Sequence, residues 1–301
     1  MNIKRGRFQN RLVKSEMDKL RELTEDFIRY LFYPDLKAMI PVSGGLDSVT
    51  TSYLLVKSLG PKRVVAFHLP HELTSSRDTE NFDLAMGRLR IEHYKFDIED
   101  IAIKLIRKVP YFRSMDKRKY KFVRAKIPAS FAIREAIIYI HGKLEEGNYR
   151  AVGALDRAEY LTGNFPKGFC TLDVAPILGM YRVQIRWLAK NLGVPDEIVY
   201  RRAEYDAECV SPQELFERGE IAQDVFLHLI YDLKLSDSEI HKLGRKYGVK
   251  LKQEELDLTR YLIAHSEHKR VLHIPYPKVT HLGINEQNLF AAYKGGEMLF
   301  P

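Results

Sequence analysis

Apolar positions along the chain follow two patterns: a helical repeat, and short apolar runs typical of buried strands. An amphipathic stretch over residues 14–32 predicts an N-terminal helix, and an apolar run over 37–42 predicts a strand. A second helix is expected over 47–59, because the periodic run stops at Gly60 and Pro61. The chain is therefore predicted to begin as helix, strand and helix.

The same alternation continues through the middle of the chain. The predicted strands cover residues 63–70, 91–98, 149–155 and 172–177, and the predicted helices cover 77–90, 129–144 and 181–193. Strands that alternate with helices along a chain usually form a parallel sheet covered by those helices. The pattern therefore predicts an α/β fold.

The pattern changes in the C-terminal part. From Pro212 onward the strand signals stop and helices dominate. Ser236 and Glu239 have the spacing of a capping box, and Gly248 stands where the helix would end. No repeat or linker separates this part from the rest, so we expect a helical C-terminal extension of one domain, residues 1–279, followed by a tail over 280–301.

Composition narrows the class of protein. The 301 residues are 45% hydrophobic and carry a formal net charge of +8, which allows one large core and favours anionic partners. No apolar run approaches the ~20 residues of a membrane span, and the basic N-terminus lacks the apolar core of a signal peptide. We therefore expect a cytoplasmic location and no membrane partner. Cys170 and Cys209 are expected to be reduced thiols.

One segment, residues 111–126, concentrates the positive charge. Its basic residues are Arg113, Lys117, Arg118, Lys119, Lys121, Arg124 and Lys126, and its aromatic residues are Tyr111, Phe112, Tyr120 and Phe122. Such a segment could bind the phosphates and stack on the bases of a nucleic acid. The alternative is a solvated loop whose aromatic side chains anchor it to the body of the protein.

The motif SGGLDS lies between the first predicted strand and the helix that follows it. In a parallel sheet, this loop is where anions meet a helix N-terminus. Gly44 and Gly45 would let backbone N–H groups approach a phosphate closely, and Ser43 and Ser48 would add hydroxyl donors. Asp47 opposes an anion unless Mg²⁺ lies between them, and its alternative role is to cap the helix.

This motif resembles the PP-loop of the ATP pyrophosphatases, which cleave ATP between its α- and β-phosphates and form an adenylated intermediate. Within that superfamily the chain resembles the ammonia-dependent NAD synthetases over roughly residues 20–279. The stretches that carry the resemblance are 43–48, 66–76, 152–165, 173–199 and 266–279. It implies a three-layer sandwich of the adenine-nucleotide α-hydrolase type in a homodimer. It also implies that ATP, Mg²⁺ and ammonia are used to convert nicotinic acid adenine dinucleotide to NAD.

The resemblance implies roles for the matching residues. The ATP-binding loop would consist of Ser43, Gly44, Gly45, Asp47 and Ser48. Asp47 and Glu159 would hold Mg²⁺, which is a sensible pair of ligands for one hard cation. The alternative for Glu159 is a solvated charge in the first turn of a helix.

Further matches concern the reacting groups. Lys167 and Lys269 would act with Asp47 as the catalytic set, because lysine can neutralise phosphate charge. Asp173, Lys167 and Arg124 would contact the anionic substrate. The alternative for Lys269 and its basic neighbours is a helix C-terminus that complements the helix dipole.

Several positions depart from the family's pattern, and all of them concern substrate recognition. Ser130 and Ala132 stand in place of two arginines, so Arg124 or Arg134 would have to supply the charge. A threonine, a glycine and a serine of the motif are replaced by Ala154, Leu155 and Ala158. The ATP half of the site is thus retained and the dinucleotide half is altered.

These departures leave alternatives open. NAD synthesis is the leading hypothesis, with free ammonia or ammonia from a separate subunit as the nitrogen source. A second hypothesis is a paralogue that adenylates a different substrate, such as a tRNA base bound through residues 111–126. A third is a non-catalytic protein that binds ATP or RNA.

Overall fold

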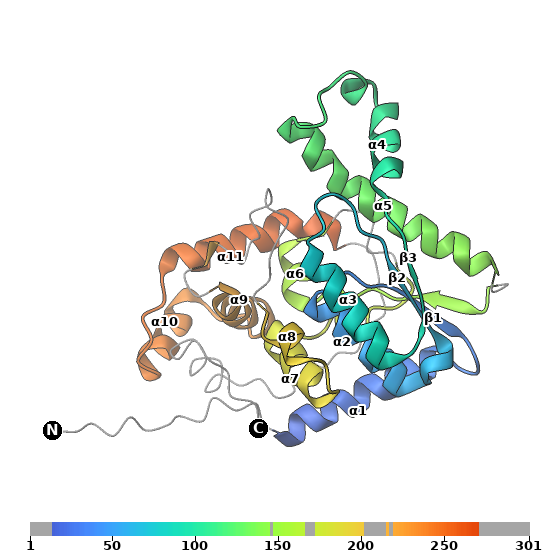
Figure 1. Ribbon diagram of the computed structural model, residues 1–301. Helices are drawn as coiled ribbons and strands as arrows, with labels where there is room; N and C mark the ends of the chain where they lie inside the picture. The colour runs from blue at the N-terminus through green and yellow to red at the C-terminus, as the bar shows by residue number, and fades with distance from the viewer. Residues whose placement is uncertain (1–13, 145–146, 166–171, 202–214, 217–218, 271–301) are drawn as a thin grey trace.

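The computed structural model describes residues 14–144, 147–165, 172–201, 215–216 and 219–270. Its centre is a parallel four-stranded sheet with the order β3-β2-β1-β4 (Figure 1). The strands are β1 (Lys37–Pro41), β2 (Val64–His68), β3 (Glu92–Lys95) and β4 (Tyr149–Ala151). The parallel sheet predicted from the sequence is confirmed.

The helices cover the sheet and extend beyond it. They are α1 (Lys14–Leu31), α2 (Leu46–Leu59), α3 (Ser76–Leu89), α4 (Glu99–Lys108), α5 (Tyr120–Leu144), α6 (Arg157–Thr162), α7 (Arg182–Asn191), α8 (Asp196–Val199), α9 (Gly219–Leu227), α10 (Asp237–Lys246) and α11 (Gln253–Ser266). In the part of the chain just described, none of these helices is long and apolar enough to cross a membrane.

The sheet separates two cores, because successive side chains of a strand point to opposite faces. Ala38 and Ile40 of β1 belong to the larger core, and Met39 between them belongs to the smaller one. Helices α1, α2 and α7 pack together over the larger core, whereas α5 contacts the other face of β1 and pairs with α4 (Figure 1). The result is the expected three-layer arrangement.

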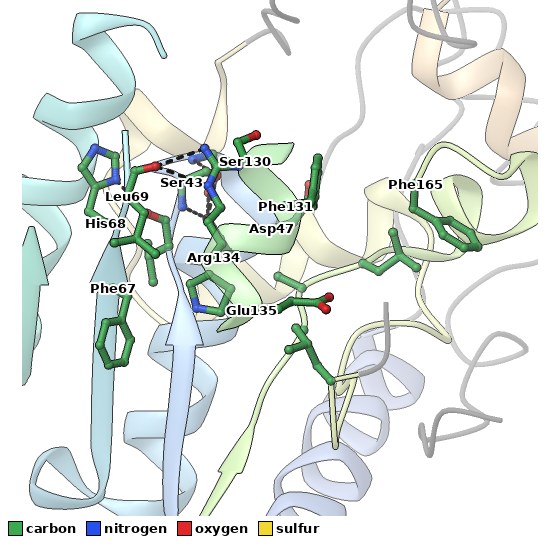
Figure 2. A pocket seen from close by; sticks show the side chains of 18 of the residues that line it. Ser43, Asp47, Phe67, His68, Leu69, Ser130, Phe131, Arg134, Glu135 and Phe165 are labelled. Atoms are coloured by element: carbon green, nitrogen blue, oxygen red, sulfur yellow. Dashed lines mark hydrogen bonds between the residues drawn. The ribbon is translucent and has the colours of Figure 1, made fainter. Parts of the chain in front are cut away.

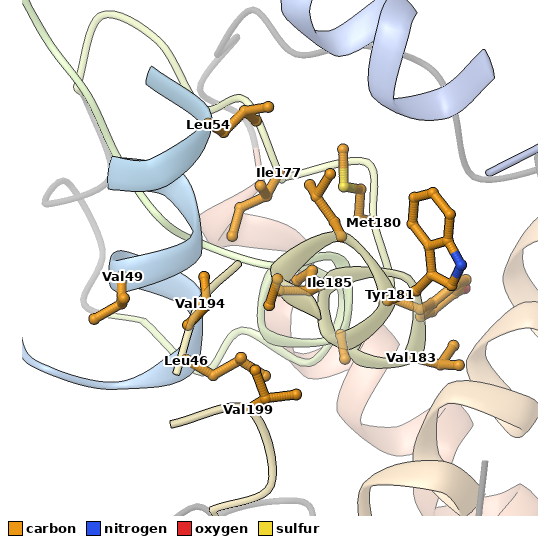
Figure 3. Packing of buried hydrophobic residues seen from close by; sticks show 14 of the residues in the cluster. Leu46, Val49, Leu54, Ile177, Met180, Tyr181, Val183, Ile185, Val194 and Val199 are labelled. Carbon is orange, nitrogen blue, oxygen red and sulfur yellow. The ribbon is translucent and has the colours of Figure 1, made fainter. Parts of the chain in front are cut away.

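Packing between α2 and the segment leading into α7 places the loop after β1. Val49 and Leu54 of α2 lie in the same buried cluster as Ile177 and Ile185 (Figure 3). These side chains are fully buried. Burying one such aliphatic side chain contributes about 1.5–3 kcal/mol. The N-terminus of α2 is therefore held in a fixed position relative to α7.

The C-terminal helices extend the larger core. Helices α9 and α11 pack against α6, and α9 also packs against α7. Helix α10 begins after Ser236, whose backbone N–H donates to Glu239 Oε2 at 2.8 Å, as the capping-box spacing predicted. Gly248 follows with a φ of 63°, as expected beyond a helix end. The proposed tail over 280–301 lies outside the described residues, and the domain boundary stays a prediction.

The structure corrects two of the predicted elements. The helix predicted over 129–144 begins at Tyr120 instead, and it continues through Pro128. Burial of Phe122 against the smaller core offsets the hydrogen bond that the proline removes. The strand predicted over 172–177 is reduced to a single bridge between Val152 and Val174. The helix α4 was not anticipated from the sequence.

Candidate active site

A cavity of about 360 Å³ opens at the carboxyl ends of β1 and β2 (Figure 2). It is lined by the loop after β1, the segment after β2, one side of α5 and the segment between β4 and α6. Its polar lining residues include Ser43, Asp47, Ser48, His71, Asp78, Ser130, Arg134, Glu135 and Glu159. This is the place where open parallel sheets bind their ligands.

Gly44 allows the loop after β1 to lie against α3. Its φ is 93°, and a Cβ at this position would lie 1.9 Å from the carbonyl oxygen of Asp78. Asn81 Nδ2 donates to the Gly44 carbonyl at 3.2 Å, which fixes the loop from the same helix. Only glycine combines this backbone conformation with this contact. The motif predicted as a phosphate-binding loop is therefore tightly constrained.

A Gly44→Ala variant is expected to lose most of its affinity for ATP with Mg²⁺, because the methyl group would push the loop away from α3. Gly87→Ala on α3 is the matched control, since a Cβ there meets nothing within 4 Å. Alanine should slightly stabilise that helix. Isothermal titration calorimetry with ATP measures both variants. An unchanged affinity in the Gly44 variant would contradict the role of this loop.

Helix α2 presents its N-terminus to the cavity. Its N-cap residue is Gly45, which supplies no side-chain hydrogen bond. The first N–H groups of a helix have no acceptor within the helix, and together with the helix dipole they favour an anion. The hydroxyls of Ser43 and Ser48 lie 3.1 Å apart beside them. Asp47 does not cap α2, so the alternative role considered for it is wrong.

Asp47 instead faces Arg182 of α7. The Arg182 Nη2 lies 3.1 Å from Asp47 Oδ2 and 3.0 Å from Asp156 Oδ2. Asp47 Oδ1 is buried and has no hydrogen-bond partner among the described residues. Burial raises the pKa of the Asp47 carboxyl to about 7, although Arg182 acts in the opposite direction. One oxygen is thus held by an arginine and the other is available for a ligand.

Glu159 lies in the first turn of α6. Its backbone N–H donates to Asp156 Oδ1 at 2.7 Å, and its Oε2 accepts from the Asp156 N–H at 3.3 Å, which makes a capping box. Burial raises the pKa of Glu159 well above its usual range, and the charges of Asp156 and Asp47 raise it further. The side chain therefore caps its helix and also lines the cavity.

Asp47 and Glu159 fit a magnesium site in which the protein supplies two carboxylates and the substrate supplies further oxygen ligands. Two carboxylates in one cavity repel each other, and a cation between them would relieve that repulsion. No group of three or more His, Cys, Asp or Glu side chains within the described ranges is placed to bind a metal. Mg²⁺ often binds one or two carboxylates and takes its other ligands from water and phosphate oxygens. The residues present fit that mode.

Other predicted residues lie away from the cavity or support its wall. Lys269 Nζ donates to the carbonyls of Gly163 at 2.7 Å and Phe165 at 2.9 Å. It thus fixes the segment that carries Phe165, which lines the cavity. Asp173 Oδ2 accepts from the backbone N–H of Ala151 at 2.8 Å and is absent from the cavity lining. Lys167, Cys170 and Cys209 lie outside the described residues.

The two arginines considered as replacements have different positions. Arg124 is exposed on α5, and its Nη1 donates to the hydroxyl of Tyr120 at 2.9 Å. Arg134 lines the cavity and donates through Nη2 to the Leu69 carbonyl at 3.2 Å. The structure therefore brings Arg134, not Arg124, to the site.

The basic segment 111–126 is anchored to the body of the protein. Phe122 is buried in the smaller core with Phe112 packed against it. Lys126 is also buried and pairs with Glu72 and with Glu99, the latter at 2.7 Å. These contacts agree with the interpretation of an anchored segment. A role for its exposed basic residues in binding nucleic acid stays a prediction.

Sequence reasoning missed Glu135. It lies on α5 and lines the cavity, and burial raises the pKa of its carboxyl to about 7. Its Oε1 is buried and has no hydrogen-bond partner among the described residues. The available signal was a single acid in the apolar run AIREAIIYI.

Comparison with known proteins agrees with this geometry. A family model described as NAD synthase matches residues 25–273. The NH3-dependent NAD⁺ synthetase of Aeropyrum pernix is 32% identical over 243 residues, which cover 77% of this chain and 78% of that protein.

Two solved structures have a similar fold. The NH3-dependent NAD synthetase of Campylobacter jejuni, in complex with nitrate, has a TM-score of 0.65 at 18% identity and covers 86% of this chain and 98% of that chain. The NMN synthetase of Francisella tularensis has a TM-score of 0.60 at 22% identity, and the match covers 87% of this chain and 97% of that chain. At these identities the likeness concerns the fold alone.

Proposed function

The chain belongs to the NAD synthase family, and from this premise we propose that it converts the carboxylate of nicotinic acid adenine dinucleotide into the amide of NAD. ATP supplies the energy and ammonia supplies the nitrogen. The enzyme is an ATP-dependent ligase that forms a carbon–nitrogen bond. The alternatives of an RNA-modifying paralogue and of a non-catalytic binding protein are not favoured, because the relatives are NAD synthetases.

The observation that carries this proposal is the loop after β1, which Gly44 holds against α3 at the N-terminus of α2. Backbone N–H groups and the Ser43 and Ser48 hydroxyls there would bind the β- and γ-phosphates, which leave as pyrophosphate. A carboxylate oxygen of the substrate would attack the α-phosphorus, so the protein needs no nucleophile of its own. Ammonia would then attack the acyl carbon of the adenylate and release AMP.

Asp47 and Glu159 would hold Mg²⁺ beside this loop. The bound cation would offset negative charge on the phosphates, which is the usual contribution of magnesium to phosphoryl and nucleotidyl transfer. Arg182 would keep Asp47 in place by holding its Oδ2, while Oδ1 has no hydrogen-bond partner among the described residues. This division of the two oxygens supports the assignment of Asp47 as a metal ligand.

The altered dinucleotide half of the site has a cationic side chain of its own. We assign Arg134 as the group that contacts the dinucleotide, because it lines the cavity that Arg124 does not reach. Lys269 would act indirectly by holding the Phe165 segment, and the roles of Lys167 and Asp173 stay predictions. The homodimer stays a prediction, since the structure contains one chain. The cytoplasmic location stays a prediction as well.

The purified chain with ATP, Mg²⁺, ammonium and nicotinic acid adenine dinucleotide should form NAD. Nicotinic acid mononucleotide is the comparison substrate, because it lacks the adenylate half and tests whether the altered positions still recognise a dinucleotide. We expect a higher kcat/KM for the dinucleotide. No NAD from the dinucleotide would overturn the proposal, and a preference for the mononucleotide would overturn the assigned substrate.

A further inference from the structure

Helix α5 presents one side to the cavity. The residues that line it recur at helical spacing, namely Ile127, Ser130, Phe131, Arg134 and Glu135. Glu135 is the one acid on this helix. In Figure 2 its carboxylate points from α5 into the cavity, on the side where Phe165 lies. Neither the phosphate loop nor the magnesium pair uses this residue.

The carboxylate of Glu135 is costly to the protein in its present surroundings. Its Oε1 is buried without a hydrogen-bond partner among the described residues. Burial raises the pKa of this carboxyl to about 7. Buried polar groups in native proteins nearly always have partners, and an exception calls for an explanation. A ligand that enters the cavity can provide the missing partner.

Charge decides which ligand that is. ATP and a dinucleotide are anionic, and a carboxylate in their cavity would weaken the binding of both by repulsion unless it faced a positive group. The reaction proposed above has a small cationic reactant, because ammonia in neutral water is mostly ammonium. On the basis of that proposed function, we infer that Glu135 binds ammonium in the cavity and accepts the proton that ammonium must lose.

The step is balanced in atoms and electrons. One N–H bond of ammonium breaks, and its proton moves to a carboxylate oxygen of Glu135. The nitrogen lone pair then forms the C–N bond to the acyl carbon of the adenylate. The C–O bond to AMP breaks, and its electron pair leaves with AMP. A second proton leaves the nitrogen to water, which completes the amide.

The test separates the two halves of the reaction in a Glu135→Gln variant. With ATP and dinucleotide but no ammonium, a rapid-quench experiment measures the pyrophosphate released in the first turnover. We expect that release to match the wild type. With ammonium added, the KM for ammonium should rise about 10- to 100-fold, the range for losing a hydrogen bond to a charged group. The KM for ATP should stay the same.

Two further variants make the test specific. Glu135→Asp keeps the charge and should recover part of the affinity for ammonium, which a merely structural role would not predict. Glu92→Gln on the exposed edge strand β3 is the control for loss of an acid elsewhere. An unchanged KM for ammonium in Glu135→Gln overturns the inference. A fall in first-turnover pyrophosphate release as large as the loss in the ammonium step overturns it too. Absence of NAD formation by the wild type would instead overturn the proposed function.

Discussion

The Asp47→Asn variant is expected to form NAD on the order of 10²- to 10³-fold more slowly than the wild type while remaining folded. Asparagine keeps the shape of the side chain but removes the negative charge that would bind Mg²⁺. A catalytic metal contributes several kcal/mol of charge stabilisation, and each 1.36 kcal/mol is a factor of ten in rate. Folding should be little affected, because Arg182 keeps Asp156 as a partner at 3.0 Å and burial already disfavours the charged form of Asp47.

Steady-state kinetics over a range of Mg²⁺ concentrations measures this effect. The loss should be partly recovered at high Mg²⁺, since Glu159 remains in the cavity. Asp83→Asn on α3 is the matched control, because Asp83 forms an exposed pair with Lys95 at 2.8 Å. Exposed ion pairs of this kind contribute little to stability, so this variant should keep the wild-type rate. A rate within threefold of the wild type would show that Asp47 does not bind the metal, a threshold of about 0.7 kcal/mol.

The Arg182→Met variant is expected to lower the free energy of unfolding by about 3–5 kcal/mol, the range for removing one partner of a buried ion pair. Arg182 is buried and lies 3.1 Å from Asp47, 3.0 Å from Asp156 and 3.9 Å from Glu220. Methionine fills a similar volume but leaves these carboxylates without their shared counter-charge. Arg186 pairs directly with Glu220 at 2.8 Å, and its charge acts more weakly on Asp47, so it replaces only part of what Arg182 supplies.

Urea denaturation measures the loss, and Arg118→Met is the matched control. Arg118 pairs with Asp116 at the surface, and its side chain is 90% exposed, so its loss should have no detectable effect. If the Arg182 variant does not fold, adding Asp156→Asn should restore folding by removing one uncompensated charge. If the free energy of unfolding of the Arg182→Met variant fell by less than about 1 kcal/mol, Arg182 would contribute no more than an exposed ion pair does. That result would contradict its role as the shared counter-charge of the buried carboxylates.

The sheet and the position of the glycine loop after β1 could be predicted because their signals are local. Strands β1 and β2 are short apolar runs, and the glycine motif follows β1 directly. The position of Gly44 against Asp78 could not be predicted, because that contact joins the loop to a helix formed after the next strand. The family resemblance, in contrast, extended well beyond the loop, and the comparisons confirm it.

The rest of the site depends on contacts between distant segments. Pro128 made α5 look shorter than it is, because burial of Phe122 overrides the local effect of the proline. Arg182 reaches Asp47 across the packing of α2 on α7, which no periodicity reveals. Glu135 gave only a weak signal, since one acid in an apolar helix has many possible surroundings. Arg124 was expected to contact the substrate, with Arg134 as the alternative, and the turn of α5 brings Arg134 to the cavity instead.

The position at which ATP is cleaved is the most direct test of the account. The wild type would react with ATP, Mg²⁺, ammonium and nicotinic acid adenine dinucleotide in which both carboxylate oxygens are ¹⁸O, and mass spectrometry would identify the products. The account predicts equal amounts of NAD, AMP and pyrophosphate, with one ¹⁸O atom in the phosphate of AMP. Formation of ADP and phosphate, or AMP without the label, would contradict attack of the substrate carboxylate on the α-phosphorus.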